Sequence, residues 1–442
     1  MSTPTHPRVL IVGTVPYNTK STSRAFDAYF HNWEKENLAQ IFSHPKKPAK
    51  GHCGTLFQIT DHRMLQRWLG KKIETGVIYQ DSELGQEWEE TASSTGSQSA
   101  YKLGRKHTPL THLLRGLLWR KKFWCTPALN RWLDEFQPQA VFLAFSDDYF
   151  IPQIAYYVAQ RYQIPIISCI GDDYYFNTEK SLSPFYHLYK STYRHLINRV
   201  LAWPGSAIYI SDKIRDKYNH EFGLNGETVY LASTIKRKSF KKIDTKHPVI
   251  TYFGNIRMGR NHSLNDIGYA LGKINHNYVL EVYSNEQDAQ FYSVFNQNPN
   301  IKFMGSVPYE HVQKRMGQSD ITVIVEGFSP EDINLSRYSL STKAADALAS
   351  GANIFVYGSL ESGIIEYMQS TQAAAVCTQK KDLIPCIKNF FEDTSRQERY
   401  YQQAIIMTEK HHNRKASCTV SEQVIERAIA LMPSKGENKN EK

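Results

Sequence analysis

Short, continuous runs of β-branched and other apolar residues recur along the chain, and each is followed by a more polar stretch of helical periodicity. One series comprises RVLIVG (8–13), TLFQIT (55–60), QAVFLAF (139–145), IPIISCIG (164–171), RVLAW (199–203) and TVYLAS (228–233). A second comprises HPVITYFG (247–254), YVLEVYS (278–284), NIKFMG (300–305), ITVIVEG (321–327), NIFVYG (353–358) and AAAVCT (373–378). Strands that are apolar along their whole length are buried on both faces, as in parallel sheets that helices cover on both sides. The pattern predicts an α/β protein built of two doubly wound, Rossmann-like domains.

The segment between the two series predicts where one domain ends and the next begins. KRKSFKKIDTKHP (236–248) is basic, has no apolar periodicity and ends on proline, which is typical of a surface linker. We therefore expect an N-terminal domain over 1–235 and a C-terminal domain over 249–415, with a ligand cleft at the carboxyl ends of the two sheets. A final helix (416–432) is expected to pack back toward the N-terminal domain, and the tail (433–442) to be disordered.

The composition is that of an ordinary globular protein, with 41% hydrophobic and 22% charged residues. No apolar run approaches the ~20 residues that span a bilayer, and the first strand follows the N-terminus without a signal-peptide pattern. We therefore expect a cytoplasmic protein. The six cysteines show no paired metal-ligand spacing, which predicts reduced thiols and no metal site.

The first candidate site residues follow the first strand of the second series. Gly254 ends VITYFG and allows a ligand to approach the backbone closely, and Asn255 comes next. Arg257 and Arg260 in the following loop are placed to reach an anionic group. Arginines in loops are also common surface residues, so this segment alone does not establish a site.

A second candidate segment, SLSTKAADALASG, carries hydroxyl groups and a lysine into the start of an alanine-rich helix. Ser339, Ser341 and Thr342 lie where a helix N-terminus exposes unpaired NH groups, which bind phosphate readily. Lys343 opposes the helix dipole unless an anion neutralises it, and Asp346 can accept hydrogen bonds from ribose hydroxyls. The alternatives are a serine or threonine cap, a solvated lysine, and an ion pair between Lys343 and Asp346.

The order of strand, glycine, basic loop, ITVIVEG and STKAADALASGANIFVYG resembles the donor-binding domain of GT-B glycosyltransferases. It is most similar to the large retaining group, related to family 4, that builds bacterial capsule, exopolysaccharide and lipopolysaccharide chains. In that group, a basic residue and, a few residues later, a lysine follow the glycine after the first strand. A pair of glutamates comes later in the chain, with seven residues between them, and alanine follows the second glutamate. Arg260 falls on the phosphate-binding lysine of the family, and Asp346 on the second glutamate, which holds the ribose of the nucleotide.

The sequence departs from the family pattern at two positions. The first glutamate of the pair corresponds to Tyr338, and Asn255 follows Gly254 where the family has arginine. The resemblance therefore implies a donor site for a nucleotide-sugar without identifying the group that contacts the sugar. It implies retention of anomeric configuration as a family expectation.

The first domain resembles the acceptor side of such enzymes only in outline. GTVPYNTKSTSRAF (13–26) follows the first strand, and its Tyr17 and Arg24 are candidates for facing the acceptor. GDDYYF (171–176) follows another strand, so that Asp172 or Asp173 could take a proton from an acceptor hydroxyl. The alternatives are a helix-surface arginine and an acidic pair that shapes a loop. SDDYF (146–150) is interpreted as a cap for the helix that follows it.

An acid-free block contributes to the net charge of +10, since 91–133 contains no Asp or Glu. Its core, KLGRKHTPLTHLLRGLLWRKKFW (102–124), combines leucines and tryptophans with basic residues, which is typical of a helix in a lipid headgroup layer. We expect this segment to contact a membrane surface; the alternative is a solvated core helix. No nucleic-acid module accompanies the block, so no nucleic-acid partner is expected.

The resulting hypothesis is a glycosyltransferase that moves a hexose-type unit from a nucleotide-diphosphate-sugar to a lipid-linked saccharide acceptor. It would act in bacterial surface polysaccharide synthesis at the inner face of the membrane. Basic residues would replace a metal, so no cofactor is expected. Two alternatives remain open: a nucleotide-sugar epimerase of the same fold, and a non-catalytic subunit that binds nucleotide-sugar, which the missing glutamate at Tyr338 would suit.

Overall fold

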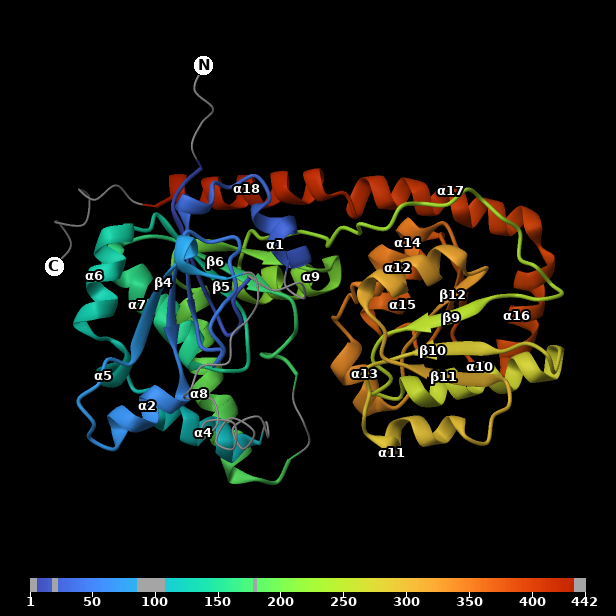
Figure 1. Cartoon of the computed structure of the whole chain (residues 1–442), viewed down its shortest axis with the longest axis horizontal. Coiled ribbons are helices and arrows are strands. Elements are labelled where there is room, and N and C mark those ends of the chain that lie inside the picture. Colours follow the sequence, from blue (N-terminus) through green and yellow to red (C-terminus); the bar gives the residue numbers. More distant parts are fainter. Residues whose placement is uncertain (1–5, 18–22, 86–107, 178–180, 433–442) are drawn as a thin grey trace, which may run out of the picture. The chain divides into compact units, whose positions relative to one another are not determined.

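The computed structural model describes residues 6–17, 23–85, 108–177 and 181–432 (Figure 1). Contacts divide the chain into two compact units, each built around a largely parallel sheet. Unit 1 comprises Met1–Val229 and Cys418–Lys442, and unit 2 comprises Tyr230–Ser417. Across the described residues, no helix is long and apolar enough to cross a membrane.

The sheet of unit 1 is parallel except at one edge, where β3 and β4 run antiparallel. Its strands lie in the order β4 (Gly76–Gln80), β3 (Thr55–Ile59), β2 (Leu38–Phe42), β1 (Val9–Gly13), β5 (Ala140–Ala144), β6 (Ile166–Ile170), β7 (Gly205–Tyr209) and β8 (Glu227–Thr228). The surrounding helices are α1 (Ser23–Phe30), α2 (Asp61–Trp68), α4 (Pro109–Leu118), α5 (Lys121–Trp124), α6 (Pro127–Phe136), α7 (Phe150–Tyr162), α8 (Pro184–Leu201), α9 (Asp212–Phe222) and most of α18 (Arg414–Ala430).

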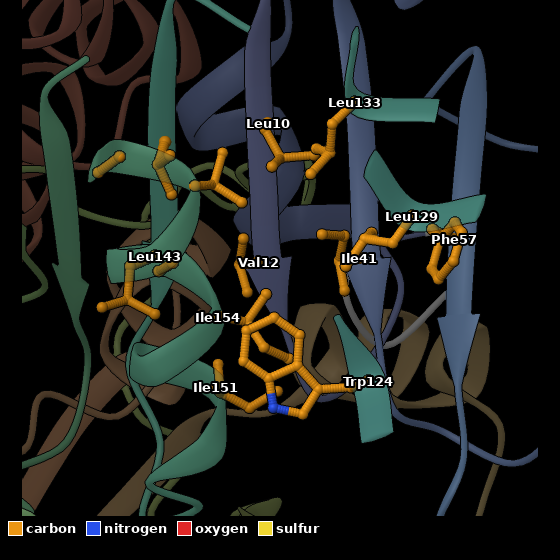
Figure 2. Close-up of a cluster of buried hydrophobic side chains, with 14 of the residues drawn as sticks. Leu10, Val12, Ile41, Phe57, Trp124, Leu129, Leu133, Leu143, Ile151 and Ile154 are labelled. Atoms are coloured by element: carbon orange, nitrogen blue, oxygen red, sulfur yellow. The ribbon is translucent and has the colours of Figure 1, made fainter. Parts of the chain in front are cut away.

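One face of this sheet packs on α6 and α7, as Figure 2 shows. Leu10 and Val12 of β1 alternate with residues on the other face, and they meet Leu133 of α6 and Ile154 of α7 in one buried cluster. Trp124 of α5 is fully buried in the same cluster. The indole that the sequence analysis placed at a lipid surface therefore belongs to the core.

The sheet of unit 2 is parallel throughout its described strands. They lie in the order β11 (Ile301–Gly305), β10 (Leu280–Tyr283), β9 (Ile250–Phe253), β12 (Ile321–Val325), β13 (Asn353–Tyr357) and β14 (Ala375–Cys377). Helices of this unit include α10 (Arg260–Ile274), α11 (Ala289–Tyr292), α12 (Tyr309–Gln318), α13 (Pro330–Ser336), α14 (Lys343–Ser350), α15 (Gly363–Thr371), α16 (Leu383–Glu392) and α17 (Thr394–His411).

The predicted strands of the second series are all confirmed, but the first series contains errors. RVLAW (199–203) is not a strand, because its first residues continue the helix α8, and of TVYLAS (228–233) only the first residue belongs to a strand. The sequence analysis also missed three strands. Gln40 interrupts the apolar run of β2, Gly205 and Ser206 open β7, and β4 is a partly exposed edge strand. None of the three shows the continuous apolar pattern that was used as the signal.

The basic segment 236–248, expected as a surface linker, belongs to unit 2 and packs along it. Ile243 is buried among the hydrophobic residues of that unit, and its backbone NH donates to Gln397 of α17 at 3.2 Å. Lys238 donates to the backbone carbonyl of Ser319. Each of the six cysteines is a free thiol.

Candidate active site

The carboxyl ends of β9 and β12 mark the position in unit 2 where the direction of strand order reverses. Successive strands after β9 are added on one side, and β12, β13 and β14 are added on the other. The loops that leave β9 and β12 therefore diverge and open a crevice, which is where open α/β sheets bind ligands. Gly254 follows β9 at this point, and Glu326 follows β12.

Gly254 and Lys343 lie so close together that a side chain at position 254 would have to displace the end of the lysine side chain. The glycine has φ +137°, and a Cβ built on it would lie 2.5 Å from Cε of Lys343 and 2.9 Å from its Nζ. Lys343 is the first residue of α14, so the helix brings its side chain across the end of β9. The sequence analysis placed these residues in two separate segments, and the structure brings them into contact.

The amino group of Lys343 is held by a tyrosine that the sequence analysis did not consider. Nζ donates to the hydroxyl of Tyr252 on β9 at 2.9 Å, and this hydroxyl donates in turn to the carbonyl of Asn255 at 2.5 Å. Burial, together with the nearby charge of Arg260, lowers the pKa of Lys343 to about 7. An anion bound beside Nζ would favour the protonated form and so raise this pKa again.

Helix α14 is built to lie close to the sheet. Ala344 and Ala347 are buried against β12 and β13, because short side chains let the helix axis approach the strands. Gly351 ends the helix in the left-handed conformation at φ +77°, which is the usual place of a glycine at a helix C-terminus. At the other end Thr342 is the N-cap, but its side chain makes no capping hydrogen bond; Ser341 Oγ accepts from the NH of Lys343 at 3.3 Å.

Arg260, predicted to bind phosphate, forms a buried ion pair with Glu326. Its Nε and Nη2 each lie 2.9 Å from a carboxylate oxygen of Glu326, and both side chains are almost fully buried. Ser263 Oγ donates to the Glu326 carbonyl at 2.7 Å and fixes the end of β12 further. Glu326 was missed although it follows the apolar run ITVIV directly, where a buried carboxylate is unusual.

Arg257 lies on the surface of the same loop and pairs with Glu286. Its Nε is 2.5 Å and its Nη2 is 2.9 Å from the carboxylate oxygens, and half of its side chain is exposed. Hydrogen bonds from Arg257 lower the pKa of Glu286 to about 2. Asn255 Oδ1 accepts from the backbone NH of Arg257 at 2.6 Å, so Asn255 shapes the loop.

Asp346 and Lys343 are bonded to different groups. Asp346 is buried and accepts from Ser233 Oγ at 2.6 Å and from the Tyr309 hydroxyl at 3.3 Å. Tyr338 and Ser339 lie in the segment between α13 and α14, both partly buried. A Cβ at Gly363 would lie 2.9 Å from the Ser339 carbonyl, so this segment packs against the start of α15.

In unit 1, the equivalent reversal of strand order falls between β1 and β5. Tyr17, in the loop after β1, is buried, and its backbone NH donates to Gln40 Oε1 at 3.0 Å. Its ring contacts Phe26 of α1, with the ring centroids 5.8 Å apart. Burial raises the pKa of Tyr17. Arg24 is partly buried in the first turns of α1.

The two aspartates after β6 have different surroundings. Asp173 Oδ1 accepts from the NH groups of Tyr175 and Phe176 and, at 2.8 Å, from the Tyr218 hydroxyl. This carboxylate therefore holds the loop in shape. Asp172 is exposed at its outer surface, but the protein around its carboxylate removes solvent and raises its pKa. Of the two, Asp172 has the environment of a proton acceptor.

A charged cluster beside this loop was not found from the sequence. Asp148, interpreted above as a helix cap, instead lies 2.5 Å from Nη1 of Arg115, whose Nη2 is 3.2 Å from Asp61. Asp61 also accepts from the indole nitrogen of Trp119 at 2.6 Å. The cluster ties α4 to the ends of β3 and β5. Among the described residues, no group of three or more His, Cys, Asp or Glu side chains is arranged to hold a metal ion.

Comparison of the whole chain with solved structures identifies its architecture. Anabaena Alr3699/HepE in complex with UDP superposes with a TM-score of 0.59 at 10% identity, covering 96% of this chain and 100% of that one. The chain has the GT-B fold. Sucrose-phosphate synthase from Thermosynechococcus elongatus shares this fold, with a TM-score of 0.58 at 10% identity over 96% of this chain and 99% of that one. HepE in complex with UDP-glucose gives a TM-score of 0.56 at 12% identity, covering 96% and 100%.

The similarity to GT-B structures is not accompanied by a match at the level of sequence families. No protein-family model matches the chain, and no curated protein matches it. At identities of 10 to 12%, the similarity to these structures concerns the fold. The GT-B architecture does confirm the two Rossmann-like domains predicted from the strand pattern.

Proposed function

We propose that this protein is a glycosyltransferase that moves a sugar from a nucleotide-diphosphate-sugar to a saccharide acceptor. The observation that carries the proposal is the contact of Lys343 with Gly254 at the strand-order reversal of unit 2. It combines a glycine, an amino group and a helix N-terminus at the position where α/β sheets bind ligands. The GT-B neighbours support it, since HepE has been solved with UDP and with UDP-glucose.

The proposed mechanism rests on stabilising the diphosphate as it leaves. Lys343, with the NH groups at the start of α14 and the hydroxyls of Ser341 and Thr342, would face the negative charge that develops on the leaving group. Arg257 would also stabilise the leaving diphosphate once its guanidinium exchanges Glu286 for a phosphate oxygen. Arg260 would contribute its positive charge while it stays paired with Glu326. Because these cations supply the neutralising charge, we propose that no metal is required.

The rest of the proposed donor site would contact the nucleoside and the sugar. Asp346 is proposed to hold the ribose, exchanging the hydroxyl of Tyr309 or Ser233 for a ribose hydroxyl. Tyr338 and Ser339, in the segment before α14, would line the sugar side. Retention of anomeric configuration and a hexosyl donor are proposed from the family resemblance.

On the acceptor side, Asp172 is the proposed general base. Burial raises its pKa, which makes it a stronger proton acceptor than an ordinary carboxylate, whereas Asp173 is proposed to position the loop. Tyr17 and Arg24 would line the acceptor path. We propose a lipid-linked saccharide of a bacterial surface polysaccharide as the acceptor, with the enzyme peripheral on the cytoplasmic face of the membrane. The basic segment 102–124 would make that contact; its residues 102–107 lie outside the described residues.

The decisive experiment incubates the purified chain with a panel of nucleotide-sugars, with and without a membrane lipid extract, and follows release of nucleoside diphosphate. Lipid-dependent release supports the transferase, and EDTA should leave the rate unchanged. Epimerised donor without release would indicate the epimerase alternative. Donor binding without any product would indicate a non-catalytic subunit.

The matched variants are Lys343→Ala and Lys380→Ala. Loss of one charge that stabilises the leaving group should lower kcat/KM by ~100-fold or more. Lys380 is an exposed lysine of the same unit, paired with Asp266, and its replacement should leave turnover unchanged. Full activity of Lys343→Ala, with an unchanged melting temperature, would refute the phosphate role of this lysine.

A further inference from the structure

The outward face of α4 in unit 1 consists of leucines. Leu110, Leu114 and Leu117 recur at helical spacing and are 45%, 54% and 50% exposed. The opposite face carries His112 and Trp119, which are buried against the rest of the unit. A helix at a protein surface normally turns its apolar side inward and its polar side to water. In α4, apolar side chains also occupy the outward side.

The start of α8, the helix that packs on the buried side of α4, also presents exposed apolar side chains. Phe185 and Leu188 are 49% and 57% exposed, and Leu182, just before the helix, is fully exposed. Helices α4 and α8 lie side by side, since the ring of His112 stacks on Tyr189 with the centroids 4.6 Å apart (Figure 1). The exposed apolar residues of each helix therefore lie within one or two helical turns of the contact between His112 and Tyr189. Single exposed leucines are common, but a gathering on adjacent helices marks an interaction surface.

The charged side chains that α4, α8 and the residues after α4 themselves carry are all basic. Residues 108–133 and 181–203 contain no Asp or Glu, and Arg120, Lys121 and Lys122 follow α4 directly with exposed side chains. Lys121 and Lys122 lie over the rings of Tyr157 and Phe123, so their positions are defined by packing. Arg115 does not add to this charge, because Asp61 and Asp148 neutralise it.

We propose that the exposed residues of α4 and of the start of α8, with the cations that follow α4, form a docking surface for an anionic lipid bilayer. This inference rests on the membrane contact in the proposed function and names the residues that make it. Leucine and phenylalanine would enter the boundary between headgroups and acyl chains, while the cations would meet the lipid phosphates. Trp119 and Trp124 are buried and would not take part.

The charge favours a bilayer over another occupant. A second copy of this chain would bring an equally acid-free, basic surface against the first, and the two would repel. A membrane that contains anionic lipid supplies both the opposite charge and an apolar layer, without requiring a shaped partner.

The test is co-sedimentation of the full chain with vesicles of phosphatidylcholine that contain about 30 mol% phosphatidylglycerol, compared with phosphatidylcholine alone. We expect binding to the anionic vesicles and at least ~10-fold weaker binding when Leu114→Glu and Leu117→Glu are combined. Phe185→Glu with Leu188→Glu should act likewise. Lys121→Glu with Lys122→Glu should abolish the preference for anionic lipid. Ile406→Glu on α17, at a position 51% exposed, is the matched control and should bind as the unaltered chain does.

Because each replaced side chain is exposed, the variants should melt at the temperature of the unaltered chain, and this measurement checks for a folding defect. Leu114→Ser combined with Leu117→Ser provides a milder second pair, which should also weaken binding. The proposal is overturned if the unaltered chain does not sediment with anionic vesicles, or if the leucine variants bind as well as the control. It is also overturned if these variants change only the oligomeric state. Binding of UDP to the chain, measured by calorimetry without lipid, does not depend on docking. Failure of docking is therefore distinguishable from failure of the proposed donor site.

Discussion

The amino group of Lys343 lies 2.9 Å from the hydroxyl of Tyr252, and this hydrogen bond joins the first residue of α14 to β9. Two segments about ninety positions apart in the sequence thereby form one wall of the candidate donor site. Tyr252 is fully buried, so its hydroxyl is a fixed reference for the lysine. The geometry makes Tyr252 a positioning residue for the proposed phosphate-binding group.

Replacement Tyr252→Phe should weaken UDP binding while leaving the fold nearly intact. Without the hydroxyl, Lys343 loses the partner that orients Nζ, and the carbonyl of Asn255 loses a donor. We expect a decrease in UDP affinity of ~5 to 10-fold, measured by calorimetry, equivalent to a lost hydrogen bond. Tyr357→Phe is the control, since Tyr357 is equally buried on β13 and donates to Asp266 instead. Equal affinities for both variants would contradict the positioning role.

Gly254→Ala should both destabilise unit 2 and displace Lys343. The added methyl would lie 2.5 Å from the lysine Cε, at a φ of +137° that alanine rarely adopts. We compare it with Gly305→Ala, which has φ +73° but open space around its Cβ. The control should cost ~1 kcal/mol of unfolding free energy through backbone strain alone. Gly254→Ala should cost ~1 to 3 kcal/mol more in urea titrations, and it alone should weaken UDP binding.

Binding of UDP should take up protons above neutral pH. The pKa of Lys343 is lowered to about 7, so at pH 8 most molecules carry a neutral amine there. A diphosphate stabilises the ammonium, raises the pKa and draws in a proton from solvent. Calorimetry at pH 8 in buffers of different ionisation enthalpy should show uptake of up to ~0.9 proton per UDP. Uptake should vanish in Lys343→Met, and affinity should fall as pH rises from 7 to 9.

Breaking the ion pair of Arg260 and Glu326 should be costly for stability. Either single replacement, Arg260→Ala or Glu326→Ala, leaves a buried charge without its partner, which costs ~3 to 5 kcal/mol. Joint replacement by Arg260→Met and Glu326→Leu removes both charges and should cost less than either single change. Chemical unfolding monitored by fluorescence provides the comparison. If the double variant were less stable than both single variants, the ion pair would stabilise the fold beyond the neutralisation of each buried charge by the other.

Much of the fold could be predicted because strands buried on both faces leave a continuous apolar signal. All the strands predicted for unit 2 are confirmed for this reason. The misread segment 199–203 shows the limit, since a short apolar run at the end of a helix looks like a strand. β2 was missed because a buried glutamine breaks its apolar pattern. The side chain of that glutamine is hydrogen-bonded to the backbone of Tyr17 and Val15 in the loop after β1.

Individual residues of the candidate site could be predicted from the sequence, but their interaction partners could not. Gly254, Lys343 and Gly351 could be recognised because a positive φ, a lysine at a helix start and a helix end each leave a local trace. The partners of the site residues could not. Tyr252, Glu326, Ser233 and Glu286 look like ordinary strand or loop residues until the fold brings them to Lys343, Arg260, Asp346 and Arg257.

The sequence by itself determined the class of fold, the parallel sheets and the place of the glycine and the lysine, because these depend on local periodicity and on backbone conformation. Only the tertiary structure decided which charged side chains are paired within the protein and which remain available to a ligand. It paired Arg260 with Glu326 and Arg115 with Asp148, and it left Leu114 and Leu117 exposed while burying Trp119. Ion pairs and burial depend on residues far apart in the chain, and a pattern along the sequence does not record them.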